Sequence, residues 1–169
     1  MEKTLSVRAA RASDLSEIDA LFGRSYPVLL KGHYPPSVLV TAIPLISKAQ
    51  PRLLTSGTYF VVLNEDARIV GAGGWTLGAP GTGRIGGNTT GHIRHVVTDH
   101  RQVRRGIGRT LMERIFESAR AVGMKRLDCL STLMAVPFYA SAGFEEVRPV
   151  SVDLRPGIEL PAILMRREL

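Results

Sequence analysis

A strand-like apolar segment ending at Thr98 is followed by a turn that contains Gly106 and Gly108, and then directly by an amphipathic helix. Glycines separated by a single residue let the backbone come close to a ligand and turn its N–H groups outward. The first turn of the helix directs unpaired N–H groups and the positive end of its dipole to the same place. This order of elements predicts a cradle that holds a pyrophosphate.

Arginines surround this turn. Arg104, Arg105 and Arg109, with Arg101 just upstream, add positive charge where an anion would bind. A Gly-x-Gly sequence is also typical of an ordinary tight turn between a strand and a helix, with the arginines facing solvent. A Rossmann dinucleotide site would need a third glycine at Arg109 or Leu111 and an acidic residue about twenty residues further on. That glycine is missing, which argues against a Rossmann site and favours the pyrophosphate cradle.

The size and charge of the chain limit its class. With 169 residues, 44% of them hydrophobic, the sequence suits a single domain over residues 1–169. Lys and Arg number 22 against 15 Asp and Glu, and the resulting net charge of +7 favours an anionic partner. A nucleic acid and a polyphosphate cofactor both meet that requirement. We expect no nucleic acid partner, because the arginines crowd around one turn without interleaved aromatic residues.

The sequence carries no pattern typical of secretion or of a membrane span. Cys129 is the only cysteine, which excludes an internal disulfide and fits a reducing cytoplasm. The first residues lack the apolar core of a signal peptide. Lys31, Pro35, Pro36 and Pro44 interrupt the one apolar region, so no stretch approaches the ~20 apolar residues of a membrane helix. We therefore expect a cytoplasmic protein with no membrane partner.

The hydrophobic pattern predicts an alternation of strands and helices. The expected strands cover residues 5–8, 58–63, 68–75, 92–98, 126–130, 144–153 and 162–167. The expected helices begin at Ser13 or Asp14, after residues 35–37, at Gly106 and at Val136. Residues 26–36 and 78–91 are expected to form loops. Together these elements indicate an α/β (α+β) domain in which helices cover both faces of a mixed sheet.

Three segments of the sequence resemble the acetyl-CoA-binding core of the GNAT N-acetyltransferases. They are Val96-Val97-Thr98, Val103-Arg104-Arg105-Gly106-Ile107-Gly108 and Pro137-Phe138-Tyr139-Ala140-Ser141-Ala142-Gly143-Phe144. The similarity is strongest over residues 92–147. Val103 departs from the family pattern, which usually has Gln or Arg there, and Ser131-Thr132-Leu133 replaces a frequent Asn. The resemblance implies a central, mostly antiparallel sheet of six to seven strands with helices on both faces.

The resemblance also implies acetyl-CoA as the cosubstrate, and no metal. Backbone groups of residues 96–98 would pair with the pantetheine arm, and residues 104–110 would hold the pyrophosphate. A hydroxyl of Ser131 or Thr132 would take the place of the missing Asn. The residues expected to bind the cofactor are Val96, Val97, Thr98, Arg104, Arg105, Gly106, Ile107, Gly108, Arg109, Thr110, Thr132 and Phe138.

Tyr139 and His92 are expected to transfer protons in the reaction that the resemblance implies. Tyr139 matches the family's tyrosine and would protonate the departing thiolate; the alternative is a core aromatic residue with a satisfied hydroxyl. The amine must lose a proton before it attacks, and His92 stands where similar enzymes often carry a Glu or His base. The alternative is a structural or surface histidine, with water as the base. On a regular strand His92, Arg94 and Val96 share a face and His95 points the other way, although family members often have a bulge here.

We therefore expect an N-acetyltransferase that moves the acetyl group of acetyl-CoA to a primary amine by direct attack in a ternary complex. The alternative is a non-catalytic acyl-CoA-binding sensor or interaction module. The acceptor is a small-molecule or peptide amine, and its pocket is expected to be bordered by Tyr26, His33, Tyr34, Trp75 and residues 78–91. The four histidines do not combine with Cys129 or a carboxylate at the spacing of metal ligands. A homodimer through the terminal strands is common among similar proteins and is left open.

Overall fold

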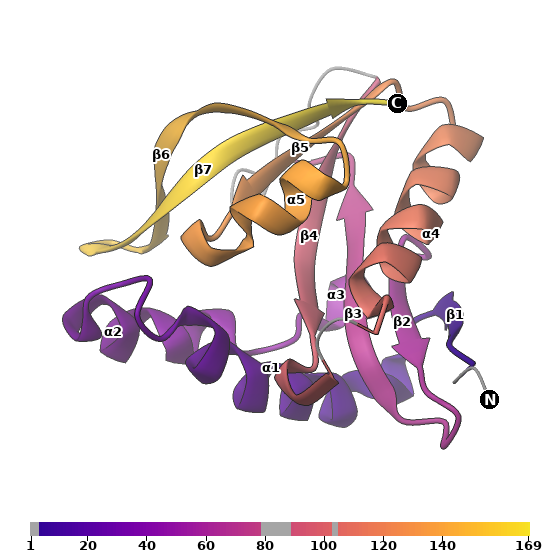
Figure 1. The fold of residues 1–169 in the computed structure, drawn as a ribbon, viewed down its shortest axis with the longest axis horizontal. Helices are drawn as coiled ribbons and strands as arrows, with labels where there is room; N and C mark the ends of the chain where they lie inside the picture. Colours follow the sequence, from indigo (N-terminus) through magenta and orange to yellow (C-terminus); the bar gives the residue numbers. More distant parts are fainter. Residues whose placement is uncertain (1–3, 79–88, 103–104) are drawn as a thin grey trace.

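The computed structural model describes residues 4–78, 89–102 and 105–169, and a seven-stranded sheet forms its centre (Figure 1). The strands are β1 (Ser6–Ala9), β2 (Tyr59–Leu63), β3 (Ile69–Thr76), β4 (Thr90–Thr98), β5 (Arg126–Ser131), β6 (Glu145–Arg155) and β7 (Ile158–Glu168). The helices are α1 (Leu15–Leu30), α2 (Pro36–Ile46), α3 (Pro51–Leu54), α4 (Ile107–Ala121) and α5 (Val136–Ser141). Three short 3-10 turns are η1 (Ala12–Asp14), η2 (His100–Gln102) and η3 (Leu133–Ala135).

The strands lie in the order β1-β2-β3-β4-β5-β7-β6. Neighbouring strands pair antiparallel, except for β4 and β5, which are parallel. The connection between β4 and β5 contains α4, as a parallel crossover requires. The expected mixed, mostly antiparallel sheet is therefore confirmed.

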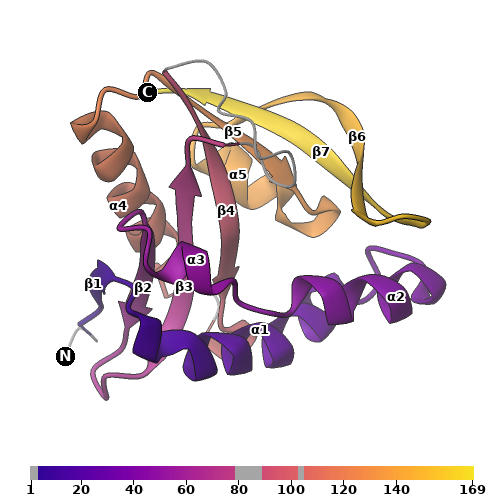
Figure 2. The same cartoon turned by 180° about the vertical axis from the view of Figure 1, so that it is seen from behind.

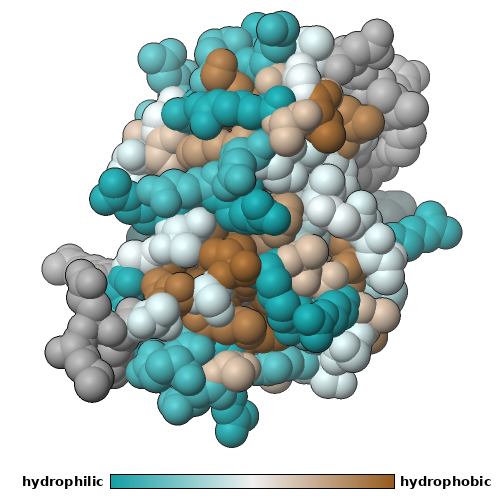
Figure 3. Space-filling view, turned by 90° about the vertical axis from the view of Figure 1, so that its right-hand side faces the viewer, coloured by the Kyte–Doolittle hydropathy of each residue, from teal (hydrophilic) through white to brown (hydrophobic). Residues whose placement is uncertain are grey.

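Helices cover both faces of the sheet, with α4 and α5 on one face and α1 and α3 on the other (Figures 1 and 2). The face of α4 that packs on the sheet follows the predicted 3.6-residue stripe and buries Ile107, Leu111, Met112, Ile115, Phe116 and Ala119. Seen from the side of α4 and β1, hydrophilic side chains cover much of the surface, with apolar patches between them (Figure 3). On the opposite face, α1 and α3 contribute Ile18, Leu21, Phe22, Leu53 and Leu54 to a second hydrophobic cluster.

Two predicted boundaries were wrong, and one short helix was not predicted. Helix α1 continues through Pro27 to Leu30, where a loop was expected from residue 26. Leu30 is buried in a small cluster with Tyr34 and Leu160, and this tertiary packing holds the last turn of the helix. Helix α3 was not predicted, and β7 begins at Ile158 rather than at residue 162. Of the expected loop over residues 78–91, residues 79–88 lie outside the described residues, and Thr90 and Gly91 belong to β4.

Strand β4 carries a bulge. Val97 pairs with Ala72 and Arg94 pairs with Gly74, so two residues of β4 lie opposite Gly73 alone. One of the two, His95, has a φ of +45°. The alternation of a regular strand therefore holds only as far as Arg94, and the bulge named as its exception is present. Both Arg94 and His95 contact Gln50, so their side chains lie on the same side of the sheet.

The sheet ends at β6, an 11-residue edge strand that pairs only with β7 among the described strands. The β6–β7 hairpin extends beyond the body of the sheet, and α2 packs beneath it (Figure 1). Along the described ranges, no helix has both the length and the apolar character that a membrane crossing requires.

Candidate active site

Strands β4 and β5 separate at the centre of the sheet. Their pairing covers Thr90 to His92 on β4 and ends at Asp128 on β5, after which β5 pairs only with β7 among the described strands. Val97 and Thr98 are paired on the β3 side alone within the described part of the chain. The other edge of β4 therefore presents backbone N–H and C=O groups that an extended ligand can pair with.

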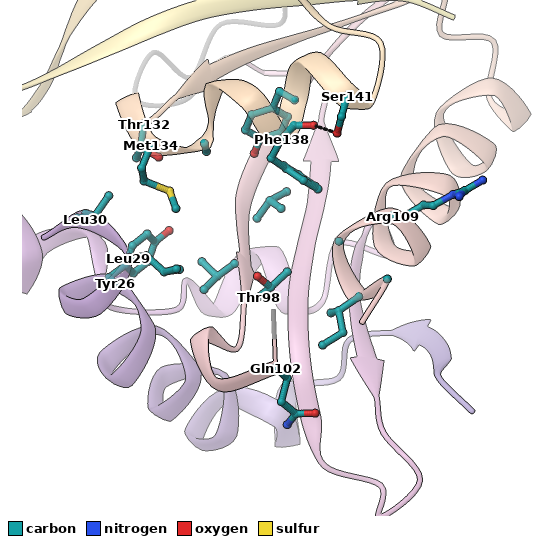
Figure 4. A pocket seen from close by; sticks show the side chains of 17 residues that line it. Tyr26, Leu29, Leu30, Thr98, Gln102, Arg109, Thr132, Met134, Phe138 and Ser141 are labelled. Carbon is teal, nitrogen blue, oxygen red and sulfur yellow. Dashed lines mark hydrogen bonds between the residues drawn. The ribbon is translucent and has the colours of Figure 1, made fainter. Parts of the chain in front are cut away.

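A cavity of about 380 Å³ opens beside this free edge (Figure 4). It lies between α1, the end of β4, the start of α4 and the η3–α5 segment. Most of the residues predicted to bind the cofactor meet here, together with the predicted proton donor: Val96, Val97, Thr98, Gly106, Ile107, Gly108, Arg109, Thr132, Phe138 and Tyr139. Of the residues expected to border the acceptor pocket, Tyr26 lines this cavity.

The start of α4 forms one end of the cavity. Gly106 precedes the helix with a φ of +76°, a conformation that glycine adopts without strain. The first backbone hydrogen bond of the helix runs from the Thr110 N–H to the Gly106 carbonyl, at 2.9 Å. The N–H groups of Ile107, Gly108 and Arg109 therefore have no partner within the helix and are available to an anion.

The cradle requires a close approach between two helices. A Cβ atom at Gly108 would lie 2.6 Å from the Phe138 ring, so only a glycine lets α5 pack this near the first turn of α4. This contact explains why position 108 is a glycine without reference to any ligand. It also fixes Phe138 as a wall of the cavity beside the free N–H groups.

The arginines around the turn differ in how much charge they leave for a ligand. Arg109 lines the cavity, but its side chain points away from it (Figure 4) and pairs with Glu113 at 3.2 Å. Burial would raise the pKa of Asp99, but hydrogen bonds from Arg101 outweigh burial and lower it to about 2. Arg101 is thus neutralised by Asp99 at 2.9 Å. Arg105 is exposed.

Some predicted residues lie apart from the cavity. Arg104 lies outside the described residues, and Arg105 and Thr110 flank the cavity without lining it. Trp75 does not border an open site, because it is buried in the core beneath α4 and donates its indole N–H to Ser118 at 3.0 Å. Tyr34 is also buried, and its hydroxyl donates to the carbonyl of Pro161 at 2.6 Å.

Tyr139 is buried where α5 meets β5, beside the thiol of Cys129. Burial, and after it the neighbouring thiol, raises the pKa of Tyr139 well above the ordinary value. The hydroxyl therefore keeps its proton at neutral pH and is available as a hydrogen-bond donor. Burial also raises the pKa of Cys129 to about 12, which excludes a thiolate nucleophile at this position.

His92 lies on β4 just before β4 and β5 separate, and it does not line the cavity. Burial lowers the pKa of His92 below 6.5. The charge of nearby Asp128 acts to raise this pKa, and the charge of Arg94 acts to lower it further. Its Nε2 atom is buried and has no hydrogen-bond partner among the described residues. The ring is therefore neutral at pH 7, with one nitrogen able to accept a proton.

Sequence reasoning missed several lining residues. Leu29 and Leu30 face the cavity from the last turn of α1, and Met134 faces it from η3. Tyr26, Leu29 and Leu30 have the i, i+3, i+4 spacing of a helix face, which could have revealed this wall. The loop expected over residues 26–36 concealed this helical spacing.

His95, in the bulge of β4, contacts α1, β2 and the segment before α3. Its ring stacks on Phe22 with centroids 5.7 Å apart, and its carbonyl accepts a hydrogen bond from the Tyr59 hydroxyl at 2.9 Å. Its Nε2 atom lies 3.3 Å from the side-chain amide nitrogen of Gln50, which can only donate. His95 is therefore neutral, with its proton on Nδ1. Burial, and after it the charge of Arg94, lowers the pKa of His95 to about 4.

This burial predicts a sensitivity to acid. Unfolded His95 takes up a proton near pH 6.5 and folded His95 only near pH 4, so the unfolded state binds more protons between these values and stability falls as the pH is lowered. From pH 7 to pH 5 we expect His95 to cost about 1 to 2 kcal/mol of unfolding free energy. Urea unfolding of the wild type and of His95→Asn, which tolerates a positive φ, measures the difference. Equal losses in the two proteins would contradict the prediction.

Across the described residues, no three His, Cys, Asp or Glu side chains gather closely enough to hold a metal ion.

The acetyltransferase (GNAT) domain model matches residues 39–160 of the sequence. No curated protein sequence matches the chain significantly.

Solved structures of similar fold cover nearly the whole chain. A GCN5-related N-acetyltransferase from Rhodopseudomonas palustris is 20% identical, with a TM-score of 0.76 over 100% of this chain and 98% of that one. The PaiA N-acetyltransferase of Thermoplasma acidophilum, in complex with coenzyme A, is 13% identical, with a TM-score of 0.73 over 98% and 99%. N-acetylglutamate synthase of Neisseria gonorrhoeae, complexed with coenzyme A and N-acetylglutamate, is 21% identical, with a TM-score of 0.62 over 100% of this chain and 36% of that one.

Proposed function

The chain belongs to the GNAT acetyltransferase family, and on that premise we propose that it transfers the acetyl group of acetyl-CoA to a primary amine by direct attack in a ternary complex. The observation that supports this most is the meeting of two binding features at one cavity. The unpaired edge of β4 and the free N–H groups at the start of α4 border the same space, with Tyr139 in its wall.

The cavity suits an elongated anionic ligand. The N–H groups of Ile107, Gly108 and Arg109 would hold the diphosphate, and the backbone of residues 96–98 would pair with the amide groups of the pantetheine arm. Phe138 and Thr132 would flank that arm. Acetyl-CoA, when bound, supplies an acyl group already activated as a thioester. The expected contributions of Arg104, Arg105 and Thr110 to the cradle remain part of this proposal.

Two side chains would move the protons. The Tyr139 hydroxyl, which burial keeps protonated, would give a proton to the departing sulfur. The attacking amine must lose a proton, because a free amine has a pKa near 10 and is almost wholly protonated at neutral pH. Neutral His92, with an unpartnered Nε2 atom, would accept that proton directly or through water.

The acceptor is proposed to be a small-molecule amine. One structure of similar fold, the Neisseria synthase, holds N-acetylglutamate, which is an acetylated small molecule. A peptide amine is the alternative within the same reaction. A cytoplasmic location belongs to the same proposal.

A sensor that binds acyl-CoA without turnover is the second candidate. One observation favours the sensor: His92, the proposed acceptor of the amine proton, does not line the cavity.

Binding and turnover separate the two candidates. Acetyl-CoA at about 100 times its Kd is expected to stabilise the protein by about 2.7 kcal/mol, seen as a rise in melting temperature. We also expect free thiol to appear when a panel of amines is added with acetyl-CoA. Stabilisation without thiol release across the panel would favour the sensor. A melting temperature that acetyl-CoA leaves unchanged would remove both candidates.

A further inference from the structure

Arg94 is a half-buried arginine whose side chain is hydrogen-bonded to two neutral residues. Its guanidinium donates to the hydroxyl of Thr76 at 3.3 Å and to the side-chain carbonyl of Gln50 at 3.1 Å. Gln50 comes from the link between α2 and α3, which crosses in front of β4 in Figure 2. An arginine has five N–H groups, and these contacts use two of them. Burial lowers the pKa of Arg94, so the site as it stands does not favour the charge that it holds.

The other partly buried arginines of the described chain have an acidic partner, except Arg167, which stacks on the Phe116 ring instead. Arg8 pairs with Asp14 at 2.8 Å, and Arg166 pairs with Asp128 at 2.8 Å. Within the described ranges, Arg94 forms no such ion pair, and residues 77–91, which lead into β4, contain no Asp or Glu. Asp128, across from His92 in the pairing register, accepts two hydrogen bonds from Arg166 and is already neutralised. A buried cation without a counterion is costly unless a ligand supplies one.

Arg94 lies near the cavity in which the reaction is proposed to occur, although it does not itself line that cavity. It lies just past the last residue pair of β4 and β5, on the side of the sheet that carries Gln50. Val96, two residues further along β4, lines the cavity. The bulge lies between these two residues, so they are near neighbours on β4 without the spacing of a regular strand. A group held by Arg94 would thus lie close to the segment of β4 that borders the cavity.

We propose that the acceptor amine carries a carboxylate and that Arg94 binds this carboxylate, which makes it a specificity-determining residue. The planar guanidinium matches a carboxylate in a two-point contact, and its unused N–H groups are the donors for it. Gln50 and Thr76 hold the guanidinium in place from two sides. The inference rests on the proposed acetyl transfer, and it narrows the acceptor to amino acids and similar amino carboxylates.

The test compares each amino carboxylate with its amide. Glycine, β-alanine, γ-aminobutyrate and L-glutamate, each paired with the corresponding carboxamide, are assayed with acetyl-CoA by release of free thiol. We expect kcat/KM for the best acid to exceed that of its amide at least about tenfold, as a charge-assisted contact allows. Arg94→Gln should remove this preference through KM for the acid, whereas Arg94→Lys should keep part of it. A glycine-initiated tripeptide distinguishes a peptide carboxylate from that of a free amino acid.

Arg52→Gln is the matched control, because Arg52 is exposed on α3, two residues after Gln50. It should leave the acid-to-amide ratio unchanged. A wild-type enzyme that acetylates acid and amide equally would overturn the proposal, as would an Arg94→Gln variant that loses both in the same proportion.

Acceptor binding, measured by calorimetry in the presence of CoA, separates this proposal from acetyl transfer itself. Binding of the acid but not of the amide, abolished in Arg94→Gln, would support the carboxylate site even if no thiol were released. Thiol release without a preference for acids would keep the enzyme and remove the carboxylate site.

Discussion

Replacing Tyr139 with Phe is expected to lower kcat by about 100-fold, at the low end of the effect of general acids, because a thiolate is a fair leaving group unaided. The substitution removes a single hydroxyl and keeps the ring that packs against Phe138 and Phe144. Binding of acetyl-CoA, measured by calorimetry, should change far less than kcat. This division between turnover and binding is what a proton donor predicts.

The control for this variant is Tyr26→Phe, which removes a hydroxyl from the opposite wall of the same cavity. Tyr26 is not assigned a proton transfer, so its loss should reduce kcat much less. Equal losses of kcat in the two variants would show that the cavity simply needs its hydroxyls. An equal loss of kcat and of acetyl-CoA binding in Tyr139→Phe would instead indicate a packing role.

Replacing Gly74 with Ala is expected to destabilise the protein by about 4 kcal/mol or more, a loss that only severe steric conflicts produce. A Cβ atom at this position would lie 2.1 Å from the carbonyl oxygen of Thr58 and 2.6 Å from the Cα of Tyr59. Both are backbone atoms that the pairing of β2 with β3 holds in place, so they cannot yield. Displacing Tyr59 would also disturb the bulge, because its hydroxyl donates to the carbonyl of His95.

Gly23→Ala is the matched control for this substitution. Gly23 lies inside α1, and a Cβ atom there would meet nothing within 4 Å. Alanine is the better helix former, so this variant should be more stable by about 0.5 to 1 kcal/mol. Urea midpoints, with the soluble yield of each variant, measure both effects. A Gly74→Ala protein as stable as the wild type would contradict the close packing of β2 against β3.

The parts of the fold that sequence reasoning predicted correctly are those with strong local signals. The stripe of α4 and the succession of strands along the chain are set by residues close together in the sequence, and the structure confirms them. Local signals failed where distant packing overrides them. Pro27 would end an isolated helix, yet the burial of Leu30 against residues of β7 carries α1 past it.

The candidate site divides in the same way. The residues of the cradle belong to one continuous motif, so spacing alone could propose them. Nothing in the sequence indicated a binding role for Arg94. That role depends on its contact with Gln50, a residue 44 positions away that only folding brings close. The direction of His95 was also beyond the sequence, since a bulge changes which side a strand residue faces without changing its spacing.

The outermost strand, β6, bears on how copies of this molecule meet. An open strand edge invites another chain to add a strand, and proteins guard against this with charge and proline. Here the exposed residues of β6 include Glu145, Glu146, Arg148, Pro149, Asp153 and Arg155. Pro149 offers no N–H to an incoming chain, and the alternating charges oppose in-register stacking. The long hairpin can thus project into solvent with an edge that disfavours the addition of a further strand.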